Sequence, residues 1–164
     1  MSKEYYVKTA EYINSRPKLK SAVIFAEKYS PKAIEIIFFS ILIFLLIKLD
    51  IRIIPAGAIP LFTFVTVTLL GRKLNFKRPF EELGFESVTP HSKGHSCPSR
   101  HAASACIITM AALYINTAVG LLSLCFAFIV CISRVVTGVH YIRDVLCGIA
   151  LSFTIGYIGF FVIL

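Results

Sequence analysis

The residues best suited to chemistry form a short run near the end of the chain. Ser133 and Arg134 are followed by five residues, His140, three more residues and Asp144. An imidazole can act as a nucleophile, and a carboxylate bonded to its second ring nitrogen fixes the tautomer and raises its nucleophilicity. If the junction is helical, the four-residue spacing places His140 and Asp144 on one face. Charged residues between apolar stretches are costly and usually functional.

Two further clusters precede this run. Their side chains suit anion binding, and they comprise Arg72, Lys73, Arg78 and Pro79 in the first cluster and Ser99, Arg100 and His101 in the second. Arginine binds phosphate oxygens in bidentate geometry. Ser99 is a good N-cap, and the N–H groups that open a helix bind anions. Taken alone, the three clusters also fit a juxtamembrane basic patch, a plain helix cap and an interfacial loop.

The elements that must position these clusters are long apolar stretches. Of the 164 residues, 57% are hydrophobic and 16% charged, with a mean hydropathy of +0.79. Residues 53–71, 102–133 and 145–164 carry no charge, and about 20 apolar residues span a bilayer. A soluble bundle would show a polar stripe on most helices. The sequence therefore predicts an all-α, polytopic transmembrane helical bundle.

We expect about five spans joined so that the three clusters share one membrane face. The expected spans are residues 33–49, 53–71, 99–114, 119–136 and 144–164. Residues 18–29 are amphipathic and predict a helix on the membrane surface, ended by Pro31. The chain thus divides into a basic N-terminal arm with an interfacial helix, residues 1–32, and a transmembrane domain, residues 33–164. The long polar loop, residues 72–98, lies on the same side as the His140 junction.

Charge and cysteine content restrict the partners and cofactors. The net charge is +8, but no basic helix with interleaved aromatic residues appears, so nucleic acid is not an expected partner. The basic arm fits an anionic lipid surface. The five cysteines lack metal or disulfide spacing, and only Cys97, in the polar loop, is expected to be reactive. Zinc held by His91, His95, His101 and Cys97 is a weak alternative, because Pro98 follows the cysteine.

The three clusters resemble the three signature motifs of the type 2 phosphatidic acid phosphatase family, which are membrane lipid phosphatases related to vanadium haloperoxidases. The third motif matches in full, from Ser133 to Asp144. In the second, Arg100 stands where the family usually has Gly. In the first, Gly71 stands where the family has Lys, so that Arg72 or Lys73 would take its place. The resemblance covers residues 72–144, and the apolar stretches agree with it.

The resemblance implies phosphoryl transfer from a lipid without a metal or other cofactor. His140 would attack phosphorus and form a phosphohistidine, Asp144 would support it, and His101 would protonate the departing lipid oxygen. The residues expected to bind the phosphate are Arg72, Lys73, Arg78, Ser99, Arg100 and Arg134. We expect an integral protein of a bacterial inner membrane, whose other partner is the bilayer.

Several functional alternatives stay open from the sequence. The expected substrates are phosphatidate, phosphatidylglycerol phosphate, undecaprenyl diphosphate or lipid A phosphate, and Arg100 either favours a diphosphate or pairs with a loop glutamate. A non-catalytic protein that binds or transports anionic lipids would not need His140 or Asp144. A soluble haloperoxidase-like enzyme conflicts with the apolar spans. The basic arm predicts a cytoplasmic N-terminus and active face, whereas many bacterial relatives are thought to act on the outer face.

Overall fold

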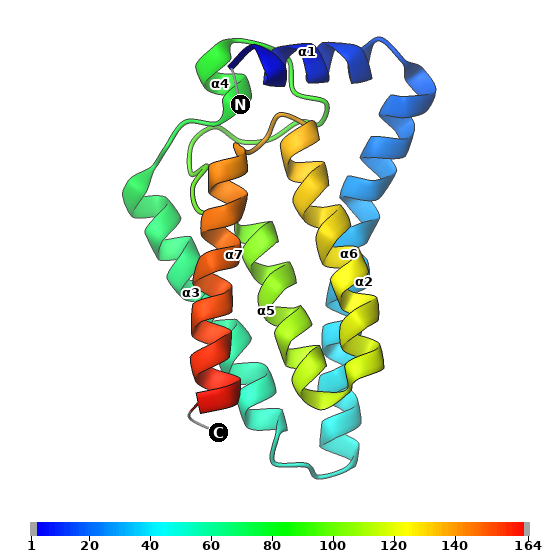
Figure 1. Cartoon of the computed structure of the whole chain (residues 1–164), viewed down its shortest axis with the longest axis vertical. Helices are drawn as coiled ribbons and strands as arrows, with labels where there is room; N and C mark the ends of the chain where they lie inside the picture. The colour runs from blue at the N-terminus through cyan, green and yellow to red at the C-terminus, as the bar shows by residue number, and fades with distance from the viewer. Residues whose placement is uncertain (1–2, 163–164) are drawn as a thin grey trace.

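The chain folds into an upright helical bundle closed at one end by a short transverse helix (Figure 1). The computed structural model describes residues 3–162, and these residues form helices and loops without strands. The elements are α1 (Lys3–Asn14), α2 (Pro17–Ile47), α3 (Ile53–Leu74), α4 (Pro79–Leu83), α5 (Arg100–Ile115), α6 (Thr117–Val136), α7 (Ile142–Tyr157) and the π-helical segment η1 (Ile158–Val162). The predicted all-α class is confirmed.

Four helices, α2, α3, α6 and α7 with η1, are long and apolar enough to cross a membrane. Large apolar side chains cover their outer surfaces, including Ile36, Ile47 and Phe128, each at least two-thirds exposed. An apolar surface of this extent is typical of contact with lipid. The fifth apolar helix, α5, is shorter, with 16 residues, and packs against all four. The predicted membrane bundle is therefore confirmed.

Small residues bring α5 close to its neighbours. Five of its buried residues are alanines: Ala102, Ala103, Ala105, Ala111 and Ala112. Small side chains let membrane helices approach closely. On α7, a Cβ at Gly148 would lie only 2.7 Å from the Ser99 carbonyl oxygen, so only glycine allows this approach. The contact sets the start of α5 against the start of α7, where Ser99 N–H donates to the Asp144 carbonyl at 2.9 Å.

Helix α2 continues through Pro31, so the prediction that this proline ends a separate surface helix over residues 18–29 is wrong. Proline lacks an N–H and leaves the carbonyl four residues earlier, at Glu27, without its helical donor. The Arg134 guanidinium donates to that carbonyl through Nη2 at 3.3 Å and so replaces the lost bond. One helix crosses the expected boundary between residues 1–32 and 33–164, and that division of the chain stays a prediction.

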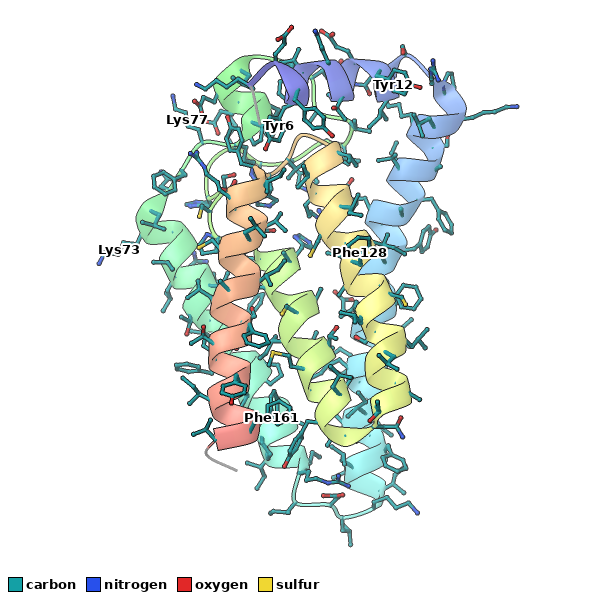
Figure 2. The ribbon with its side chains drawn as sticks, in the orientation of Figure 1. Tyr6, Tyr12, Lys73, Lys77, Phe128 and Phe161 are labelled. Atoms are coloured by element: carbon teal, nitrogen blue, oxygen red, sulfur yellow. The ribbon has the colours of Figure 1, made fainter. Side chains whose placement is uncertain are left out.

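Helix α1 covers one end of the bundle rather than lying free on a membrane. Its buried residues are Tyr6, Ala10 and Ile13. Ala10 and Ile13 pack with residues of the long loop and of α6, and the Tyr6 ring packs edge-on against Tyr141. The Tyr6 side chain points from α1 toward the bundle (Figure 2), and its hydroxyl accepts from the Ile142 N–H at 3.2 Å. Helix α4 lies beside the start of α1, and beneath α1 lie the loop of residues 84–99 and the α6–α7 junction (Figure 1). The three motif clusters therefore converge at this end, as predicted.

Candidate active site

The turn after α6 brings His140 into the bundle. Gly138 has a φ of 75°, and a Cβ there would lie 2.6 Å from the Phe85 ring, so the turn requires glycine. His140 follows at the junction and is 3% exposed. Its Nδ1 lies 2.7 Å from the Ser96 carbonyl oxygen. A carbonyl can only accept, so Nδ1 carries the proton and Nε2 carries the lone pair.

The environment of His140 keeps its imidazole neutral. Burial lowers the pKa of His140 below the usual value of 6.5, and the positive charge of Arg78 lowers it further. The unprotonated Nε2 accepts a hydrogen bond from Nη1 of Arg78 at 3.3 Å. A neutral imidazole with an unprotonated nitrogen beside a guanidinium can attack an anion held by that guanidinium.

Asp144 supports His140 indirectly. Its Oδ2 accepts from Ser96 Oγ at 2.5 Å and from the Tyr141 N–H at 3.0 Å. The same oxygen lies 3.9 Å from His140 Nδ1, which is too long for a hydrogen bond. The expected direct bond between Asp144 and His140 is therefore absent, because His140 precedes α7 instead of sharing a helical face with Asp144. The carboxylate holds Ser96, whose carbonyl in turn holds the imidazole.

Arg78 connects the long loop to the α6–α7 junction. Its side chain is 5% exposed, and it donates through Nε to the Gly94 carbonyl at 3.0 Å and through Nη1 to the Val139 carbonyl at 3.3 Å. Burial lowers the pKa of Arg78, and the nearby charges of Arg100 and Arg134 add to this effect. Two guanidinium groups, those of Arg78 and Arg100, line the same cavity, which favours an anion between them.

Arg134 is held by α2, a contact that the sequence analysis missed. Glu27 is buried, and its Oε1 accepts from Arg134 Nη1 at 2.9 Å. His91 Nε2 lies 3.3 Å from the same nitrogen. Nε of Arg134 is buried and has no hydrogen-bond partner among residues 3–162, and Arg134 is not one of the residues that line the cavity beside His140. In the sequence, the one feature that could have pointed to Glu27 is its position as a carboxylate four residues before Pro31.

A cavity of about 60 Å³ joins these side chains. It is lined by Arg78, His91, Ser92, His95, Arg100, His101 and His140. A volume of this size holds roughly four to six water molecules, which is room for one small anion. The predicted residues Arg78, Arg100, His101 and His140 are therefore brought together. His91, Ser92 and His95 were not expected to bind phosphate.

Other predicted site residues lie outside this cavity. Ser99 is fully buried, and its hydroxyl accepts from the Ala102 N–H at 3.5 Å as a helix cap. Arg72 and Lys73 are exposed in the last turn of α3, and Lys73 points away from the bundle (Figure 2). His95 instead lies against the family's first-motif position, with Nδ1 3.2 Å from the Gly71 carbonyl oxygen.

The expectations of a reactive Cys97 thiol and of a reaction without a metal have different outcomes. Cys97 is buried, and burial raises the pKa of its thiol to about 12, so the prediction of a reactive thiol is wrong. Among residues 3–162, no three His, Cys, Asp or Glu side chains group as metal ligands. Whether the reaction needs a metal is not decided by this finding, and metal independence stays a prediction.

An apolar groove leads from the cavity along α5. Its first part, of about 260 Å³, shares Arg100 and His101 with the cavity and is also lined by Ile34 of α2 and Phe64 of α3. A second part of about 440 Å³ continues from Phe64 deeper between α2, α3 and α5. The polar cavity and the apolar groove together can hold a phosphate group with a hydrocarbon chain attached.

Fold and site together define an integral membrane protein of the lipid-phosphatase class, with a histidine beside a cationic cavity that opens to an apolar groove. The sequence model of the PAP2 superfamily matches residues 52–163. The chain belongs to the PAP2 superfamily.

The chain is also similar to individual proteins. The chain is 28% identical over 142 residues to undecaprenyl-diphosphatase BcrC of Bacillus subtilis (strain 168), covering 87% of this chain and 74% of BcrC. The crystal structure of Aquifex aeolicus LpxE superposes with a TM-score of 0.72 at 22% identity, covering 95% of this chain and 92% of LpxE. The likeness to LpxE concerns the fold. A PAP2-type phosphatidylglycerolphosphate phosphatase of Bacillus subtilis gives a TM-score of 0.49 at 21% identity, covering 94% of this chain and 90% of that protein.

Proposed function

We propose that this protein hydrolyses a lipid phosphomonoester or diphosphate in a bacterial inner membrane through a phosphohistidine at His140. The observation that carries the proposal is the position of His140 Nε2, which is unprotonated and accepts a hydrogen bond from Arg78 at the cavity. The apolar groove, which continues from that cavity, supports a lipid as the substrate.

The proposed reaction has two displacements at phosphorus. First, His140 Nε2 bonds to phosphorus while the bond from phosphorus to the lipid oxygen breaks, and the electron pair stays on that oxygen. His101, which shares the cavity, gives a proton to the departing oxygen. Then water attacks phosphorus, His101 accepts its proton, and orthophosphate leaves as the bond to His140 breaks.

The remaining charged residues stabilise the transferring group. Arg78 neutralises charge on the oxygens of the transferring phosphoryl group, which is the largest electrostatic requirement of phosphoryl transfer, and Arg100 binds the substrate where the cavity meets the groove. Asp144 acts as a positioning residue through Ser96. We propose that these side chains supply the charge stabilisation without a metal ion.

The substrate candidates are phosphatidate, phosphatidylglycerol phosphate, undecaprenyl diphosphate and lipid A phosphate. The relative BcrC is named for the third of these. A phosphate-release assay on the detergent-purified protein, with each lipid in mixed micelles and a chelator present, tests the proposal. The same panel is run on a folded His140→Ala variant.

We expect release from at least one lipid by the wild type, and a loss of about 10³-fold or more in His140→Ala. Normal turnover by His140→Ala would contradict the proposal. An absence of release from every lipid, with retained binding of anionic vesicles, would instead support a non-catalytic lipid-binding protein.

A further inference from the structure

We propose that Arg100 forms a second phosphate subsite at the mouth of the cavity, which makes a lipid diphosphate the preferred substrate class. The inference rests on the proposed function of the same site and specifies which lipids it takes.

Arg100 lies where the two compartments meet. It is the first residue of α5, and it lines both the polar cavity and the apolar groove. His101 is the other residue that lines both. A substrate that extends from the cavity into the groove must therefore pass Arg100.

No loop glutamate pairs with Arg100. Among the residues that the structure describes, Arg100 takes part in no ion pair and no side-chain hydrogen bond. Two loop carboxylates bind elsewhere: Glu81 accepts from the Gly94 N–H at 2.9 Å, and Glu82 accepts from Tyr141 and Lys3. The alternative in which Arg100 only balances a loop glutamate is thus not found, and its guanidinium is available to a ligand.

The path of the hydrocarbon chain separates two phosphates. The terminal phosphoryl group lies beside His140 and Arg78 in the cavity. The second phosphate of a diphosphate then lies on the side from which the hydrocarbon chain leaves. Arg100 is the cationic side chain that lines the groove at that point.

The position of Arg100 favours an anion beside it. The positive end of the α5 dipole repels a cation in the first turn. The groove beside it is lined by apolar side chains such as Ile34 and Phe64 and by one carboxylate, Glu35, with which Arg100 forms no ion pair. A lipid monophosphate would place its first carbon atoms against the guanidinium. A diphosphate would place an anion there, with bidentate hydrogen bonds to Arg100.

The second subsite also fits the chemistry of the leaving group. When His140 Nε2 bonds to the terminal phosphorus, the bond from that phosphorus to the bridging oxygen breaks. The electron pair stays on the bridging oxygen, which becomes part of a lipid monophosphate, and Arg100 stabilises this negative charge. Water then hydrolyses the phosphohistidine to orthophosphate.

The test compares a polyprenyl monophosphate and a polyprenyl diphosphate with the same chain in mixed micelles. Arg100→Gly introduces the residue usual in the family, and Arg100→Lys keeps the charge without the bidentate geometry. Arg16→Gln removes one exposed charge from the link between α1 and α2 and serves as the matched control. We measure kcat/KM for both lipids with each variant.

We expect the wild type to prefer the diphosphate. Arg100→Gly should lower kcat/KM for the diphosphate about 10- to 100-fold, as expected for a lost hydrogen bond to a charged group, and lower it far less for the monophosphate. Arg100→Lys should retain part of the preference. Arg16→Gln should keep the wild-type ratio.

A diphosphate-to-monophosphate ratio that stays the same in both Arg100 variants, or that falls equally in Arg16→Gln, would overturn the second subsite while leaving the phosphatase proposal in place. Failure of the wild type to release phosphate from either lipid, or from the wider panel, would instead overturn the proposed function.

Discussion

The two walls of the cavity differ in how their charged groups are held. The partnered wall is formed by Arg78 and His140, which line the cavity, and is supported by Arg134 and Asp144, which do not line it; each of these side chains is buried and hydrogen-bonded within the protein. On the open wall, formed by Arg100 and His101, both side chains are exposed, and neither makes a side-chain hydrogen bond within residues 3–162.

This difference separates chemistry from substrate choice. A reacting group needs a fixed position, which the surrounding hydrogen bonds of the partnered wall provide. Residues that meet different lipids need free donors, and these lie on the open wall beside the groove. We therefore expect substitutions in the partnered wall to affect folding and turnover for every substrate. On the open wall, substitution of Arg100 should change the choice among substrates, whereas substitution of His101, the proposed proton donor, should lower turnover for every substrate.

The largest effect on the partnered wall is expected from Glu27→Ala. Loss of the carboxylate leaves Arg134 buried without its counter-charge, and breaking a buried ion pair costs about 3–5 kcal/mol in unfolding free energy. Thermal unfolding in detergent measures the change, with Glu11→Ala on the exposed face of α1 as the control. An unfolding temperature equal to that of the wild type would show that Glu27 does not hold Arg134.

The second prediction concerns the indirect support of His140. Asp144→Asn should lower kcat about 10- to 100-fold, as is typical for residues that orient a reacting group through another residue. Ser96→Ala should lower kcat by a smaller factor, because the Ser96 carbonyl still accepts from His140. Steady-state kinetics on the best lipid of the panel measures both. A greater loss in Ser96→Ala than in Asp144→Asn would contradict this order.

The third prediction is the pH dependence set by His140. Its pKa is lowered from 6.5, and the neutral form is the nucleophile, so the acid limb of kcat/KM should lie below pH 6.5. The free energy of unfolding depends on pH in the same direction, because it also decreases as the pH falls. The unfolded histidine binds a proton more readily, so its contribution is full above pH 6.5 and is lost as pH falls toward the lower folded pKa.

A pH profile with two lipids whose phosphates ionise differently separates His140 from the substrate. The acid limb should stay at the same pH with both lipids. A limb at or above pH 6.5, or one that moves with the lipid, would contradict the assignment.

The smallest effect is expected from the basic residues of the first motif. Lys73 points away from the bundle, so Lys73→Ala should change kcat/KM by less than about threefold. His95 lines the cavity beside Gly71, so His95→Ala should lower kcat/KM about tenfold through a lost hydrogen bond to a charged group. The same phosphate-release assay compares them. A larger loss of kcat/KM in Lys73→Ala than in His95→Ala would show that the basic residue of the first motif lies on α3.

The apolar helices could be predicted from the sequence because their signal is local. The stretch without charge at residues 53–71 became α3, Ile53–Leu74, and the expected span 119–136 became α6, Thr117–Val136. Alternation of the spans also predicted that His140, Arg78 and His101 would meet. These conclusions need only hydropathy and the lengths of the turns.

The errors arise where a distant partner decides the local structure. Pro31 does not end α2, because the carbonyl it leaves free bonds to Arg134, and Glu27 was missed because Arg134 lies 107 positions away. Ser96 was missed for the same reason, since its partner Asp144 lies 48 positions along the chain. No local pattern identifies such pairs.

The most direct test of the central claim is to trap the enzyme intermediate. The wild type is mixed with a lipid whose terminal phosphate is radiolabelled, quenched in alkali within one turnover, and digested for peptide mapping. The account predicts label on the peptide that contains His140, stable to alkali, released by acid and absent in His140→Ala. Turnover without labelled protein, or label on the peptide that contains His101, would contradict the account.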